Sequence, residues 1–142
     1  MKKIIVLAIA LMALVPVMDA QIVINKSTKV ETIKSWRMGW VSLTRHEGWY
    51  SLCLKSDNQF DHHYIIVLGE QEKAEQSLQT LIDLASTIDK EETIEFENGH
   101  QTIRAFKGAF KGELWFKADG YAGYGKTSKM ELEMVMKALK KQ

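Results

Sequence analysis

The stretch YIIVLGEQEKAEQSLQTLIDLASTI, residues 64–88, decides the fold class. Its first five residues are an unbroken apolar run, typical of a buried strand, and Gly69 ends that run. From residue 71 onward, apolar residues recur every three or four positions, which predicts a helix with one buried face. The residues of this face are Ala74, Leu78, Leu81, Ile82, Ala85 and Ile88. A strand followed at once by an amphipathic helix indicates a mixed α and β domain.

The segments on either side are predicted to be strands. Before residue 64, the patterns predict strands at residues 21–25 and 29–37, and a hairpin of residues 40–46 with 49–55 that turns at Gly48. After residue 88, strands are expected at residues 93–97 and 101–106 around Asn98-Gly99, a strong hairpin signal. Further strands are expected at 113–118 and around 121–126. Ser128 and Glu131 then form a capping box that begins a last helix.

Two strand-rich halves, each followed by one amphipathic helix, predict the fold class. We expect an α+β fold in which an antiparallel β-sheet carries both helices on one face. Residues 64–84 and 121–141 both run from a strand through a glycine into a helix, which leaves open a duplication. Because no linker or low-complexity tract separates the halves, residues 21–142 are predicted to form a single domain.

The first 20 residues have the three parts of a secretory signal peptide. Lys2 and Lys3 precede an unbroken apolar run over residues 4–15, and Ala20 is a small residue suited to cleavage. The apolar stretch is shorter than the roughly 20 residues that cross a bilayer as a helix. The sequence therefore predicts an exported bacterial protein, periplasmic or extracellular, with no stable membrane anchor after cleavage.

Composition excludes several classes of protein. The chain of 142 residues has a single cysteine, Cys53, so it cannot form an intrachain disulfide or a zinc finger. Without residues 1–20, which hold Lys2, Lys3 and Asp19, the 19 basic and 18 acidic side chains become 17 of each. Phenylalanines and lysines alternate over residues 106–117, as on a basic aromatic surface. The absence of any basic excess nevertheless argues against nucleic acid as a partner.

The sharpest motif is GYAGYGKT, residues 120–127, which matches the phosphate-binding pattern G-x-x-x-x-G-K-[ST]. In that motif backbone N–H groups hold phosphates, Lys126 would reach the terminal oxygens and Thr127 would hold Mg²⁺. Too few residues follow Thr127 for further parallel strands, and a glycine-bearing turn before a helix cap needs the same residue types. We therefore predict no cofactor, and phosphate binding by this loop is left open.

Histidines and carboxylates offer a weaker signal. His62 and His63 are neighbours, so in an extended segment they point to opposite faces and cannot share a metal ion easily. No metal site and no catalytic residue is assigned. The alternative function is nevertheless a small exported hydrolase, in which His46, Glu47, Asp61, His62 or His63 forms a histidine–carboxylate site.

Aromatic residues give the leading hypothesis. Trp36, Trp40, Trp49 and Tyr50 lie within residues 36–50, around the first predicted hairpin. If the strand is continuous, Trp36, Met38 and Trp40 share one face; if that face is exposed, it is a platform for sugars or for an apolar protein surface. The alternative is that these rings form the core beneath the helices. We therefore predict a non-enzymatic binding module whose ligand is an unidentified protein or glycan, with these four aromatic residues as the binding residues.

Overall fold

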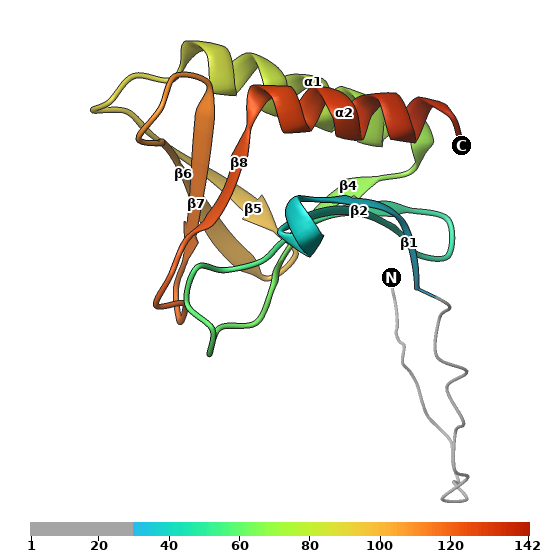
Figure 1. Cartoon of the computed structure of the whole chain (residues 1–142), viewed down its shortest axis with the longest axis horizontal. Coiled ribbons are helices and arrows are strands. Elements are labelled where there is room, and N and C mark those ends of the chain that lie inside the picture. Colours follow the sequence, from blue (N-terminus) through green and yellow to red (C-terminus); the bar gives the residue numbers. More distant parts are fainter. Residues whose placement is uncertain (1–29) are drawn as a thin grey trace, which may run out of the picture.

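The computed structural model describes residues 30–142, which form eight strands, one short 3₁₀ turn and two helices (Figure 1). The signal peptide predicted for residues 1–20 and the strand predicted at residues 21–25 lie outside the described residues.

The first half is an antiparallel sheet of four strands in the order β1-β2-β3-β4. It is followed by the helix α1, and the 3₁₀ turn η1 joins its first two strands. The elements are β1 (Glu31–Trp36), η1 (Arg37–Gly39), β2 (Val41–Arg45), β3 (Tyr50–Leu54), β4 (Tyr64–Gly69) and α1 (Gln71–Thr87).

The second half repeats this plan, with a sheet in the order β5-β6-β7-β8 and a final helix. The elements are β5 (Thr93–Asn98), β6 (Gln101–Lys107), β7 (Glu113–Ala118), β8 (Gly125–Ser128) and α2 (Lys129–Lys140). The predicted fold class is confirmed: the fold is α+β, and each strand-rich half is followed by one helix. Ser128 begins α2 as predicted, since its hydroxyl accepts a hydrogen bond from the Glu131 N–H at 3.2 Å.

The eight strands form two sheets instead of one continuous sheet. The two sheets are joined by side-chain hydrogen bonds and one isolated bridge, and not by a full ladder of backbone hydrogen bonds. On one side, Asn98 at the end of β5 donates to the Ile65 carbonyl at 2.7 Å and accepts from the Val67 N–H at 2.8 Å. Its amide group thus takes the place of a strand partner for β4. On the other side, the sheets meet at one isolated bridge between Ser56 and Gly125.

Both helices lie side by side over the sheets (Figure 1), and α2 reaches across from its own half to the other. The first helix packs on β3 and β4, whereas α2 packs on β1 and β2 as well as on β8. The core therefore contains residues of both halves, including Tyr64, Phe116, Leu132 and Leu139, each at most 1% exposed. Within residues 30–142, neither helix has the length and apolar character to span a membrane.

Candidate functional site

The turn η1 has an unusual backbone. Arg37, Met38 and Gly39 all have positive φ, at 48°, 55° and 91°. A left-handed conformation costs a non-glycine residue roughly 1–2 kcal/mol, so the surroundings must hold this turn in place. The turn separates β1 from β2, so Trp36 and Trp40 do not lie along one continuous strand as the parity argument assumed. Met38 instead projects from the tip with 99% of its surface exposed.

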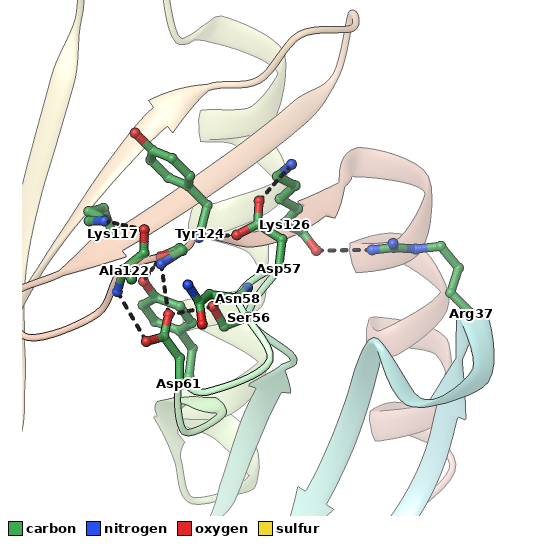
Figure 2. Close-up of polar contacts among 11 residues, drawn as sticks. Arg37, Ser56, Asp57, Asn58, Asp61, Lys117, Ala122, Tyr124 and Lys126 are labelled. Carbon is green, nitrogen blue, oxygen red and sulfur yellow. Dashed lines mark hydrogen bonds and ion pairs between the residues drawn. The ribbon is translucent and has the colours of Figure 1, made fainter.

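An ion pair to α2 holds this turn. Arg37 donates from both Nε and Nη2 to the carboxylate of Glu131. Its Nη2 also donates to the Lys126 carbonyl at 3.0 Å, as Figure 2 shows. Glu131 is only 9% exposed and accepts a further hydrogen bond from the Thr127 hydroxyl at 3.3 Å. The side chain that could have completed the capping box is therefore used to anchor the turn that carries Met38.

Apolar side chains gather beside this anchor. Met130 and Met134, which are 66% and 40% exposed, stand one turn apart on α2, and Trp36 is half-buried next to them. Trp36 and Met134 border two hollows, of about 230 Å³ and about 490 Å³. We call Trp36, Met130 and Met134, together with Met38 at the tip of the adjoining turn η1, the Trp36 surface. Clustered exposed apolar side chains mark interaction sites, and methionine adapts its shape to a partner.

The other three predicted binding residues lie elsewhere. Tyr50 is 8% exposed and belongs to the core. Trp40 is half-buried, and the Lys55 ammonium lies 5.3 Å from its ring centroid. Trp49 stands at the far end of the β2–β3 hairpin, where the His46 ring stacks on it at 3.7 Å. The four aromatic residues are therefore not brought together on one face, and their own neighbours occupy one face of two of the rings.

One histidine of the predicted hydrolase site has a defined partner. The Nε2 atom of His46 lies 2.9 Å from the Ser51 hydroxyl, and desolvation lowers the pKa of His46. Ser51 is fully buried, so a substrate could not reach its hydroxyl. Cys53 lies beside this pair, half-buried, with its sulfur 3.3 Å from the Thr44 hydroxyl. These contacts form a polar cluster on the outer face of the first sheet, in which the hydroxyl partner of His46 is buried.

Within residues 30–142, no histidine–carboxylate hydrogen bond joins the remaining predicted residues of that alternative, although Asp61 and His62 border one small hollow of about 80 Å³. Glu47, His62 and His63 are exposed, and the Asp61 carboxylate is bound by backbone groups of a distant loop. Among residues 30–142, no group of three or more histidine, cysteine, aspartate or glutamate side chains could hold a metal ion.

The glycine-rich loop of residues 120–127 does bind anions, and those anions are carboxylates of the same chain (Figure 2). Asp61 accepts from the N–H groups of Ala122 at 3.0 Å and Gly123 at 2.7 Å, and Asp57 accepts from the Tyr124 N–H at 2.7 Å. We call these five residues the aspartate clasp. Since these N–H groups bond to carboxylates, the strand expected around residues 121–126 begins only at Gly125.

The other two groups of the phosphate motif are also engaged. The Lys126 ammonium lies 3.0 Å from the Asp57 carboxylate and 4.1 Å from the ring centroid of Trp115. Thr127 is 1% exposed and donates to Glu131. The match to the phosphate pattern is therefore explained by contacts within the protein.

Hydrogen bonds set the ionisation of the clasp carboxylates. Desolvation alone would raise the pKa of Asp61, but the hydrogen bonds from Ala122, Ser56 and Gly123 outweigh it and lower that pKa. Desolvation is likewise outweighed at Asp57, whose pKa is lowered by the Tyr124 N–H and the Lys126 ammonium. Both carboxylates are thus favoured in the charged form that the loop binds.

The alternating phenylalanines and lysines of residues 106–117 do not form one surface. Phe116 is fully buried in the core, whereas Phe110 is 75% exposed in the turn before β7. Phe106 lies on the outer face of the second sheet, near Tyr124. The alternation of side chains along β6 and β7 sends these rings to different sides.

Comparison of this chain with protein-family models, with curated proteins and with solved structures finds no match.

Proposed function

We propose that this protein is an exported, non-enzymatic interaction module that binds a partner protein through the Trp36 surface. The observation that carries the proposal is the turn at Arg37 and Met38. A left-handed backbone at two non-glycine residues, anchored by a buried carboxylate, projects a fully exposed methionine next to Trp36. Strained conformations of this kind persist where surrounding contacts enforce them, and they cluster at functional sites.

The nature of the side chains favours a protein over a glycan. Sugars stack on open aromatic ring faces, but Lys55 and His46 cover one face of Trp40 and Trp49. The Trp36 surface consists mainly of methionines, whose flexible thioether chains suit the apolar side chains of another protein. The hydrolase alternative has less support, because the hydroxyl beside His46 belongs to the buried Ser51.

Comparative capture tests this proposal. The tagged exported protein is incubated with the secreted and periplasmic fraction of the producing cells, beside a variant carrying Met38→Ser and Met134→Ser. The control variant carries Phe60→Ser and Phe110→Ser, which alter two other exposed apolar residues away from this surface (86% and 75% exposed). We expect wild type and control to capture the same protein and the methionine variant to lose it. Equal capture by all three proteins would contradict the proposal.

A further inference from the structure

A groove runs between the edge strand β1 and the exposed side of α2. Its apolar floor comes from Ile33 and Trp36 on β1 and from Met134 and Ala138 on α2. Trp36 also borders the second hollow, beside Arg37 and Met130, so the two hollows adjoin. An elongated surface of this form fits a stretch of polypeptide better than a compact small molecule.

The rim of this groove is positively charged. Lys34 stands on β1, and Lys137 and Lys141 stand opposite it at the end of α2. Lysines near the end of a helix interact favourably with the helix dipole. Lys34 lies on a strand, so the dipole does not explain its position, and its charge adds to that of the lysines on α2. As far as the structure describes the chain, the lining of the first hollow includes no aspartate or glutamate. The adjoining hollow includes Glu113 and Glu131, and Glu131 is already paired with Arg37. Charge complementarity therefore selects an acidic occupant.

The strand β1 offers backbone groups to such an occupant. Within residues 30–142, β1 is an edge strand whose hydrogen-bonded neighbour is β2. Lys34 and Trp36 lie on the same face of the sheet, since they are two residues apart and pair with Leu43 and Val41 of the core, beyond a register shift between Thr32 and Lys34. An extended segment at this edge would place alternate side chains into the groove, as in the addition of a strand to a sheet.

We propose that the partner contributes an extended acidic segment, which pairs with β1 and places apolar side chains between β1 and α2. This inference rests on the proposed function and names the chemistry of its partner. The lysine rim binds the carboxylates of the segment. The same rim disfavours a second copy of this chain, since pairing two β1 edges brings the lysines of both copies together.

A synthetic peptide tests this inference. A short fluorescein-labelled peptide of alternating valine and glutamate is titrated with the exported protein, and binding is followed by fluorescence anisotropy. We expect saturable binding that weakens as salt is added, because exposed charges are screened. The same peptide with lysine in place of glutamate should not bind. A third peptide, N-methylated at alternate residues, should bind at least about tenfold more weakly, since it lacks donors along one edge.

Protein variants locate the site. Lys34→Glu combined with Lys137→Glu should weaken binding of the valine–glutamate peptide by at least about tenfold. The matched control, Lys73→Glu combined with Lys90→Glu, reverses two exposed lysines outside the groove and should leave binding unchanged. Circular dichroism spectra of both variants confirm that they are folded.

Three outcomes would overturn the inference: equal binding of the glutamate and lysine peptides, full binding of the N-methylated peptide, or a concentration-dependent dimer formed through β1. None of these affects the proposed function, which depends on loss of capture by the methionine variant. Conversely, if that variant captures its partner as wild type does, the proposed function fails even where the acidic peptide binds.

Discussion

The aspartate clasp and the Trp36 surface lie on the two sides of β8 and use their polar groups in opposite ways. The three N–H groups of the clasp and the neighbouring Lys126 ammonium bind the carboxylates of Asp57 and Asp61, so these groups already have anions within the protein. Beside the Trp36 surface, Arg37 and Glu131 also bind each other, but this ion pair holds the turn from which Met38 projects into solvent.

A sequence motif and a binding site therefore need not coincide in this protein. The loop with the phosphate-binding pattern joins the two halves of the molecule, because its anions come from the loop between β3 and β4. The surface proposed to bind a partner has no recognisable motif. It consists of Trp36 and exposed methionines, and the ion pair between the half-exposed Arg37 and the buried Glu131 holds the turn that carries Met38.

The largest loss of stability is expected from a substitution that forces the clasp open. In Gly123→Ala, the new Cβ would stand 2.2 Å from the Asp57 carboxylate and 2.6 Å from the backbone nitrogen of Asn58. Backbone cannot yield as a side chain does, so we expect a loss of about 3 kcal/mol in the free energy of unfolding, the upper end for overpacking. Urea denaturation measures this loss. The control Ala122→Gly keeps the N–H group that Asp61 binds, and its stability should stay within about 1 kcal/mol of wild type. A stable Gly123→Ala protein would refute the role of the clasp.

The anchor of the turn should have the next largest effect. Glu131→Ala leaves Arg37 and the Thr127 hydroxyl without their partner. Breaking a fully buried pair costs roughly 3–5 kcal/mol, but the Arg37 side chain is 46% exposed, so we expect the free energy of unfolding to fall by about 2 kcal/mol. Denaturation in urea measures it, with Glu133→Ala on the exposed side of α2 as control. Capture of the partner should also fall; unchanged capture would show that the ion pair does not position Met38.

Acid should weaken the clasp more than the Trp36 surface. The pKa values of Asp57 and Asp61 are lowered in the folded protein, so their contribution to stability is present above the unfolded carboxyl pKa of about 3.9. It is lost as the pH falls through the folded values. Denaturation curves recorded from about pH 6 down to about pH 3 should therefore show a smaller decline for the double variant Asp57→Asn, Asp61→Asn. Parallel declines for the two proteins would contradict this assignment.

The smallest effect has the opposite sign. Met38→Gly relieves a left-handed conformation that disfavours methionine, so the free energy of unfolding should rise by about 1 kcal/mol. Partner capture should nevertheless decrease, because an exposed apolar side chain is removed. Thermal denaturation and capture of the same preparation separate the two effects. A variant that is more stable and equally effective in capture would remove Met38 from the binding surface.

Much of the fold could be predicted from local patterns. The helix over residues 71–88, the Asn98-Gly99 hairpin and the Ser128 cap all depend on near neighbours in the sequence, and they are found at or close to the predicted positions. The start of β8 was placed too early because the N–H groups of residues 122–124 bond to Asp57 and Asp61. Such contacts join residues about sixty positions apart and leave no periodic trace in the sequence.

The candidate site could be predicted only in part. Trp36 was singled out for its aromatic ring, but its neighbours Met130 and Met134 were missed, although their spacing of four places them together on a helix. Both lie outside the buried stripe of Leu132, Val135 and Leu139, and this was the available signal. The left-handed backbone of Arg37 could not be foreseen, because it depends on a glutamate in the other half of the chain.

The most direct test of the interaction surface is oxidation of individual methionines, measured by mass spectrometry after brief treatment with peroxide. In the free protein, Met38, Met130 and Met134 should oxidise readily, whereas Met136, at 9% exposure, should resist and serves as the internal control. With the captured partner bound, we expect Met38 and Met134 to be protected from oxidation and Met136 to be unchanged. Undiminished oxidation of Met38 and Met134 in the intact complex would contradict this expectation.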